Sequence, residues 1–218
     1  MNLKYNLVIA FIISLFSVIG FGIISLLISD QKISQFDDTI ISAIQGRENP
    51  ALTSVMKFFT LIGSSLFVII ISLFIMIYLY IVLHHRLELI LFIAAIAGSG
   101  ILNGILKHLF HRNRPHLHRL IDVTGYSFPS GHAMSAFAVY GILAFLLWRH
   151  ISSRLGRGLL ILFSIVMILA IGISRIYLGV HYPSDIIGGY FASGFWLACA
   201  IWVFQFYKEK RYNKRINY

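Results

Sequence analysis

Three segments of this sequence place basic, histidine and acidic side chains at spacings that suit the binding and transfer of a phosphate group. In the first, KHLFHRNRP (residues 107–115), Lys107 and Arg114 are seven residues apart. Seven residues are about two turns of an α-helix, so both side chains would project from one face. Because Pro115 disfavours α conformation before it, we expect the helix to end near Arg114. Two such cations suit a phosphate; an interfacial anchor of snorkelling side chains is the alternative.

The second segment, FPSGHAMS (residues 128–135), delivers a histidine to the start of an apolar, helix-like run. Ser130 is a natural N-cap, and Gly131 lets a ligand approach the backbone closely. Free N–H groups and the helix dipole favour an anion there. A bound anion would favour protonated His132, which could then act as a general acid. Taken alone, the segment is better explained as a capped helix whose histidine hydrogen-bonds a neighbour.

The third segment is SRIYLGVHYPSD (residues 174–185). Arg175 stands at the end of an apolar run, and His181 and Asp185 are four residues apart at the start of the next one. A carboxylate at that spacing can accept a hydrogen bond from one ring nitrogen, which leaves the other nitrogen free to attack. The alternative is a capping acid beside a surface histidine.

The elements that must position these segments are membrane-spanning helices. The chain of 218 residues is 58% hydrophobic and 12% charged, against roughly 25% charged in soluble domains. Despite a net charge of +10, so few charged residues exclude a disordered chain and a nucleic-acid binder with an extended basic face. The single cysteine, Cys199, cannot form an intrachain disulfide.

The apolar runs predict an all-α integral membrane protein, a bundle of six transmembrane helices in one domain over residues 1–218. A span needs about 20 apolar residues. The first run exceeds the roughly 7–15 residues of a signal-peptide core and lacks an A-x-A-like site, so we interpret it as a retained helix. The predicted spans are residues 7–28, 61–83, 87–106, 130–148, 159–173 and 186–206, with 30–60 as an interfacial segment.

The distribution of lysine and arginine predicts the orientation. The termini and the loops at 84–86 and 149–158 hold ten basic residues against one acid outside the spans, Glu209. We therefore expect a multi-pass protein of the cell membrane with both termini cytoplasmic. All three chemical segments then lie on the extracytoplasmic side, each at the end of a span.

The interfacial segment has an amphipathic pattern. Asn49-Pro50 predicts an N-cap followed by the first residue of a helix. We expect an interfacial helix before it that roofs the site or borders the path of the lipid. Apolar residues recur there at helical spacing, with polar ones on other faces: Ile33, Phe36, Ile40, Ile41 and Ile44, against Asp37, Asp38 and Gln45.

Together the three segments resemble the signatures of the type 2 phosphatidic acid phosphatase family of membrane lipid phosphatases. Those signatures are K-x6-RP, PSGH and SR-x5-H-x3-D, and every spacing matches in the expected order between residues 107 and 185. The six-helix layout extends the resemblance over nearly the whole chain. No position of the three signatures departs from the family pattern.

The resemblance implies a role for each matched position. His181 is the expected nucleophile, forming a phosphohistidine, Asp185 its orienting partner, and His132 the acid that protonates the departing alcohol. The family uses no metal, and no other cofactor is expected. The outer segments add no cluster of histidine and acidic residues to the residues already assigned. The implied phosphate-binding residues are Lys107, Arg114, Ser130, Gly131 and Arg175.

The expected partners are a lipid phosphate substrate and the bilayer, with no nucleic acid. Resemblance to bacterial members implies phosphatidylglycerol phosphate, phosphatidic acid or undecaprenyl pyrophosphate, which the sequence does not rank. A lipid phosphotransferase with the same histidines and a non-enzymatic lipid transporter are the alternatives. The sequence predicts neither the oligomeric state nor a role for His111, which shares the helical face of Lys107.

Overall fold

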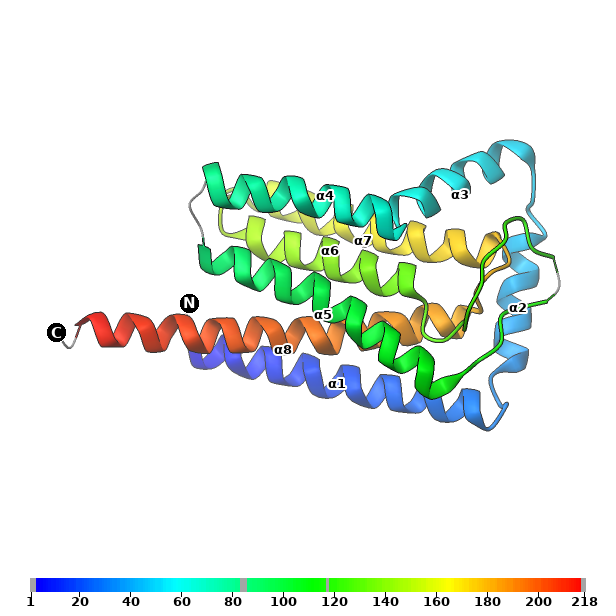
Figure 1. Ribbon diagram of the computed structural model, residues 1–218, viewed down its shortest axis with the longest axis horizontal. Coiled ribbons are helices and arrows are strands. Elements are labelled where there is room, and N and C mark those ends of the chain that lie inside the picture. Colours follow the sequence, from blue (N-terminus) through cyan, green and yellow to red (C-terminus); the bar gives the residue numbers. More distant parts are fainter. Residues whose placement is uncertain (1–2, 83–85, 117, 217–218) are drawn as a thin grey trace.

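A computed structural model describes residues 3–82, 86–116 and 118–216 (Figure 1). All regular structure in these residues is helical, as predicted. The elements are α1 (Leu3–Ser29), α2 (Ser34–Gln45), α3 (Pro50–Ile62), α4 (Ser65–Ile77), the π-helical turn η1 (Tyr78–Val82), α5 (Arg86–Phe110), α6 (Gly131–Trp148), α7 (Arg154–Tyr177) and α8 (Pro183–Ile216).

The long helices run side by side, and the short helix α2 lies across one end of the bundle (Figure 1). Helix α8 packs along α1, while α6 packs against α5, α7 and α8. The start of α1 and the end of α8 both lie at the end of the bundle opposite α2 (Figure 1). The bundle therefore has a capped end, beneath α2, and an uncapped end.

Within the described residues, five helices are long and apolar enough to cross a membrane: α1, α5, α6, α7 and α8. Helices α3 and α4 make a sixth span only if they are counted together, and they meet at a bend of 54°. The predicted continuous span 61–83 is therefore wrong in its first residues, because Gly63 ends α3 and Ser64 caps α4. Its last residue, 83, and residues 84–85 of the predicted loop lie outside the described residues.

Helix ends follow capping chemistry more closely than hydropathy. Asn49 is the N-cap of α3, as predicted, since its Oδ1 accepts a hydrogen bond from the backbone N–H of Leu52 at 2.9 Å. Ser130 caps α6 in the same way. Other helices continue beyond their apolar stretches, because a helix end need not coincide with the lipid boundary. Helix α5 nevertheless ends at Phe110, so the predicted helix end near Arg114 is wrong.

The centre of the bundle is packed through apolar and small residues of α5, α6 and α8. Phe92, Ala95 and Ile142 are fully buried there. A Cβ atom added at Gly98 would lie 2.0 Å from the ring of Trp196, so α5 and α8 approach too closely for a larger residue. Small residues therefore allow the close contact between α5 and α8.

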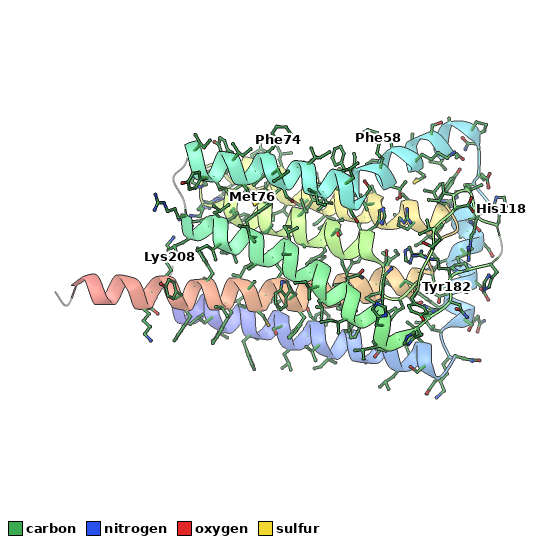
Figure 2. The ribbon with its side chains drawn as sticks, viewed as in Figure 1. Phe58, Phe74, Met76, His118, Tyr182 and Lys208 are labelled. Atoms are coloured by element: carbon green, nitrogen blue, oxygen red, sulfur yellow. The ribbon has the colours of Figure 1, made fainter. Side chains whose placement is uncertain are left out.

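The outer surface of the bundle is apolar. Figure 2 shows Phe58 and Phe74 directed away from the helices, and their exposed fractions are 58% and 70%. Large apolar side chains exposed along α1, α4 and α5 form a continuous apolar exterior. Such an exterior suits contact with lipid tails.

Helix α2 is amphipathic, as predicted, and packs its apolar side on the bundle. Ile41 and Ile44 contact a buried cluster that includes Ile176 of α7 and Ile186 of α8. Asp37, which the periodicity assigns to another face, is instead only 1% exposed. The capped end of the bundle therefore buries a carboxylate of α2.

Candidate active site

The predicted site residues all lie at the capped end of the bundle, beneath α2. They come from the three predicted segments, which lie at the ends of four different helices and in the segment after α5. Lys107 is in the last turn of α5, Arg114 in the segment 111–130, Ser130, Gly131 and His132 at the start of α6, Arg175 in the last turn of α7, and His181 and Asp185 at the start of α8.

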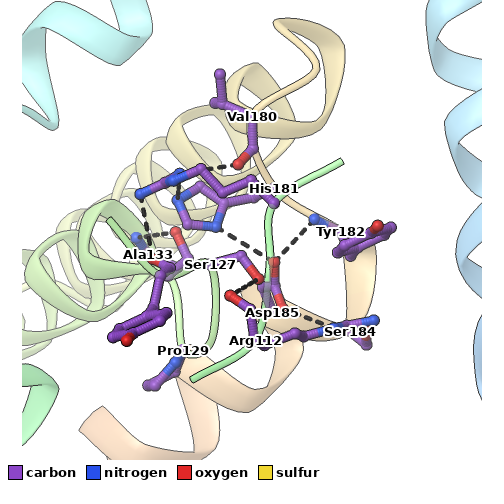
Figure 3. A network of polar contacts seen from close by, with 12 residues as sticks. Arg112, Ser127, Pro129, Ala133, Val180, His181, Tyr182, Ser184 and Asp185 are labelled. Carbon is purple, nitrogen blue, oxygen red and sulfur yellow. Dashed lines mark hydrogen bonds and ion pairs between the residues drawn. The ribbon is translucent and has the colours of Figure 1, made fainter. Parts of the chain in front are cut away.

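His181 and Asp185 form a buried pair at the start of α8 (Figure 3). The Nδ1 atom of His181 is 3.3 Å from Oδ2 of Asp185, and Nη1 of Arg114 is 3.1 Å from Nε2 of His181. A guanidinium group only donates, so Nε2 must accept and Nδ1 must carry the proton that faces Asp185. The Nε2 atom thus holds the free electron pair that a nucleophile requires.

The surroundings of His181 also keep it uncharged. Burial lowers the pKa of His181 from about 6.5 to about 4. The carboxylate of Asp185 opposes this shift, while the positive charges of Arg114 and Arg175 add to it. At neutral pH the imidazole is therefore neutral, which is the state that can attack phosphorus.

Arg114 is held rigidly by backbone carbonyl groups. Its guanidinium donates to the oxygen atoms of Gly125 at 2.9 Å, Val180 at 2.8 Å, and Thr124 and Tyr126 at 3.2 Å each. The side chain is only 6% exposed. Because these bonds fix the plane of the guanidinium, its position beside Nε2 of His181 is preorganised.

Lys107 and Arg114 converge, but for a reason different from the predicted one. They do not share a helical face, because α5 ends before Arg114. The following segment instead folds back, held by Ser127, whose backbone N–H donates to the oxygen of Arg112 at 2.8 Å. This brings the carbonyl oxygen of Tyr126 to 2.9 Å from Nζ of Lys107 and 3.2 Å from Nη2 of Arg114.

The start of α6 is fixed against its neighbours. Ser130 accepts a hydrogen bond through Oγ from the N–H of Ala133 at 3.4 Å and donates its own N–H to the oxygen of Asp185 at 3.1 Å. The Nδ2 atom of Asn103 donates to the oxygen of Pro129 at 3.0 Å. The first turn of α6 is thereby tied to both α5 and α8.

His132 lies in that first turn, beside the bend between α3 and α4. It interacts electrostatically with Arg175, His181 and Lys107. A Cβ atom added at Gly63 would lie 3.1 Å from Cδ2 of His132, so the end of α3 forms one wall around the imidazole. The bend in the second membrane segment thus belongs to the site.

Arg175 supplies a buried cation with a hydrogen-bonding group to spare. Its side chain is 2% exposed, and Nη1 donates to the hydroxyl of Thr60. Its Nε atom is buried and has no hydrogen-bond partner among the described residues. An unpaired buried donor on a cation is a ready partner for an anionic oxygen.

A cavity of about 320 Å³ adjoins His181. Its walls come from α2, the segment after α5 and the turn between α7 and α8, and they include Ile41, Gln45, Pro115 and Tyr182. The volume is at the lower end of the range typical of small-molecule sites. The cavity is therefore open space on one side of His181, and His181 is the one predicted site residue among the described residues that line it.

Sequence reasoning missed several residues of the site. Arg112 binds Asp185 at the start of α8 (Figure 3). Asp37 binds Arg112 and Ser184, and Thr60 binds Arg175. Arg112 stands in the basic run, but nothing in the sequence separates it from its neighbours. His111 packs its ring on that of Tyr126, with centroids 4.5 Å apart.

Among the described residues, no group of three or more histidine, cysteine or acidic side chains is arranged to hold a metal ion. The positive charge near His181 comes from Lys107, Arg114 and Arg175. Such a cluster of cations beside a neutral histidine is suited to an anion such as a phosphate group.

The fold and the site define an all-helical membrane protein with a cluster of cations around a buried histidine at one end. Residues 88–210 match the PAP2 superfamily. The chain belongs to this superfamily, which confirms the resemblance predicted from the three motifs, and it is a multi-pass membrane protein.

Two curated relatives are phosphatases by name. Phosphatidylglycerophosphatase B of Bacillus subtilis (strain 168) is 31% identical over 173 residues, which cover 78% of this chain and 84% of the relative. The putative undecaprenyl-diphosphatase YbjG of Escherichia coli (strain K12) is 38% identical over 109 residues, which cover 45% of this chain and 48% of the relative.

Two solved structures share the fold. The crystal structure of a transmembrane PAP2-type phosphatidylglycerolphosphate phosphatase from Bacillus subtilis has a TM-score of 0.76 at 28% identity, covering 90% of this chain and 96% of that one. The crystal structure of Aquifex aeolicus LpxE has a TM-score of 0.61 at 24% identity, covering 76% and 94% of the two chains.

Proposed function

We propose that this protein is a lipid phosphate phosphatase that hydrolyses its substrate through a phosphohistidine at His181. One observation carries the proposal: a neutral, oriented histidine lies close to Arg114 and Arg175, and Lys107 in turn lies close to these two arginines. Phosphoryl transfer needs this combination of a nucleophile with charge neutralisation at the phosphate oxygens.

In the first step, Lys107 and Arg175 bind the phosphate oxygens together with the hydroxyl of Ser130 and the backbone N–H of Gly131. Arg114 turns the N–H group that now faces Nε2 of His181 to a phosphate oxygen, which frees Nε2. The Nε2 atom of His181 attacks phosphorus while the bond to the lipid oxygen breaks. His132 gives its proton to that departing oxygen, and the bound anion favours the protonated form of His132 beforehand. Asp185 holds the Nδ1 proton and stabilises the positive charge that develops on His181.

In the second step, His132 is neutral and acts as a base. It removes a proton from water, the water oxygen attacks phosphorus, and the bond between phosphorus and Nε2 breaks. Inorganic phosphate leaves, and both histidines return to their starting states. No step requires a metal or another cofactor in this scheme.

We propose that the substrate is a membrane lipid phosphate, with phosphatidylglycerol phosphate, phosphatidic acid and undecaprenyl pyrophosphate as the candidates. The curated relative that aligns over most of its own length is named for phosphatidylglycerophosphate, so this phosphomonoester is the first to test. The apolar exterior supports a lipid, because a lipid could present its phosphate without leaving the bilayer.

The test is phosphate release by purified protein in detergent across these three lipids, with EDTA present. Wild type should release phosphate from at least one lipid, and His181→Ala should lower the rate on the order of 10⁴-fold or more. A transporter would release no phosphate. A phosphotransferase would form a phosphorylated acceptor in place of free phosphate, and full activity of His181→Ala would refute the phosphohistidine.

A further inference from the structure

A buried carboxylate on the outer helix α2 is bound to the machinery that orients His181. We propose that Asp37 is a positioning residue for the nucleophile, acting through Arg112 and Ser184. The proposal rests on the proposed function of His181. It assigns α2 a part in the chemical step, in addition to covering the site.

Asp37 uses both of its carboxylate oxygens at the start of α8. Oδ1 accepts a hydrogen bond from the backbone N–H of Ser184 at 2.9 Å, and Oδ2 accepts one from the hydroxyl of Ser184 at 2.6 Å. Oδ2 also accepts from Nη2 of Arg112 at 2.9 Å. Because Asp37 is 1% exposed, water does not compete for these bonds.

Arg112 carries the connection from Asp37 to the catalytic pair. Its Nη1 donates to Oδ1 of Asp185 at 2.6 Å and to the hydroxyl of Ser184 at 2.8 Å (Figure 3). The guanidinium carbon also lies 4.1 Å from the centroid of the Tyr182 ring. The guanidinium is therefore clamped between two carboxylates and an aromatic face.

The two oxygens of Asp185 have separate partners as a result. Oδ1 is held by Arg112, and Oδ2 faces Nδ1 of His181 at 3.3 Å and accepts the backbone N–H of Tyr182 at 2.9 Å. The plane of the carboxylate, and so the direction of the imidazole, depends on where Arg112 is held. Asp37 holds it there.

The charge of Asp37 has a second effect. The side chain of Arg112 is only 16% exposed and faces two carboxylates. The group formed by Asp37, Arg112 and Asp185 therefore carries a net negative charge. If Asp37 were neutral, Arg112 would pair with Asp185 alone and would draw that carboxylate away from His181. An asparagine at position 37 would also point its amide N–H groups at the N–H or O–H donors of Arg112 or Ser184, so a hydrogen bond would be lost there.

The decisive experiment compares Asp37→Asn with a matched loss of charge elsewhere on the same end of the molecule. Asp30 is exposed and pairs only with Lys32 in the described network, at 2.9 Å, so Asp30→Asn is the control. Both variants are purified, and kcat and KM are measured per folded enzyme on a short soluble phosphate ester. This substrate does not depend on a path for lipid tails.

We expect Asp37→Asn to lower kcat about 10- to 100-fold, as when outer partners of functional histidines are lost at metal sites. KM should stay within about twofold, because the phosphate-binding cations are not in this network. Asp30→Asn should match wild type. Arg112→Gln should resemble Asp37→Asn, and the double variant should be no worse than Arg112→Gln, because both changes break one connection.

Two results would overturn the proposal. One is an unchanged kcat in Asp37→Asn, and the other is a double variant whose losses multiply. If Asp37→Asn does not fold, Ser184→Ala tests the same connection more gently and should lower kcat with little change in KM. Failure of the proposed function would look different, because wild type itself would then release no phosphate.

Discussion

The neighbours of His181 determine which of its two ring nitrogen atoms carries the proton. Arg114 donates toward Nε2 of His181 from 3.1 Å, and Asp185 accepts from the side of Nδ1 at 3.3 Å. Burial then lowers the pKa of His181 to about 4. At the scale of residues, therefore, the site fixes the tautomer, the charge and the direction of the proposed nucleophile.

This predicts the acidic side of the pH dependence. In the proposed mechanism His181 attacks when neutral, so kcat/KM should rise with pH through the pKa of His181, near 4. At pH 6.5 nearly all of His181 should already be neutral, whereas an ordinary histidine would be half protonated and the rate would be halved. The measurement is kcat/KM from pH 3.5 to 8 on two phosphate esters with different second pKa values. A transition that follows the ester belongs to the substrate. A rise in kcat/KM centred near pH 6.5 and common to both esters would contradict the prediction.

Arginine is required at position 114 for its shape as well as its charge. Arg114→Lys keeps the charge but cannot reach the four carbonyl groups that the guanidinium now binds. We expect kcat/KM to fall about 100-fold and the free energy of unfolding to fall by about 1–3 kcal/mol. Arg47→Lys, at an exposed arginine, is the control. Equal behaviour of the two variants would contradict the assigned role.

At the scale of elements, the bend between α3 and α4 shapes the pocket. It lets the end of α3 reach Arg175 through Thr60 and His132 through Gly63. A straight helix through residues 50–77 could not turn back over α7 in this way. The bend is therefore a feature of the site as well as of the membrane span.

Gly63→Ala tests the bend. The added Cβ would lie 2.5 Å from Cγ2 of Ile171 and 3.1 Å from the ring of His132. We expect a loss of about 1–3 kcal/mol in stability and a lower kcat, measured by thermal unfolding and phosphate release. Gly100→Ala, where nothing lies within 4 Å, should be harmless. The double variant with Ile171→Ala should lose less stability than the sum of the two single losses, because the smaller side chain removes the clash. Additive losses would implicate another contact.

At the scale of the whole molecule, the two ends of the bundle differ in charge. The 34 residues of α8 extend for about 51 Å at 1.5 Å per residue, well beyond a hydrocarbon core of about 30 Å. The helix begins at the site, so its basic end lies at the uncapped end, together with Arg149, Arg154 and Arg157. This arrangement supports the proposal that the site is extracytoplasmic and the termini cytoplasmic.

Labelling of single cysteines would test that orientation. In a Cys199→Ser background, Asp122→Cys should react with an impermeant maleimide in intact cells. Ser152→Cys, in the loop between α6 and α7, should react only after lysis. Both positions are exposed, so access to the reagent should depend on the side of the membrane alone. The reverse pattern would place the site in the cytoplasm.

The sequence alone determined what depends on local chemistry. Apolar runs marked the helices that could cross a membrane, Asn49 and Ser130 marked two helix starts, and the three spaced motifs identified the family and the residues that gather at one end. Short-range rules suffice for these features, because hydropathy, capping and motif spacing are properties of neighbouring residues.

Only the tertiary structure decided how distant groups meet. Lys107 and Arg114 converge through a folded-back segment, Thr60 reaches Arg175 across a bend, and Asp37 is buried against α8. Whether a carboxylate faces water or a buried arginine depends on which helix lies above it. That placement follows from the packing of the whole bundle, and a periodic pattern within one segment does not contain it.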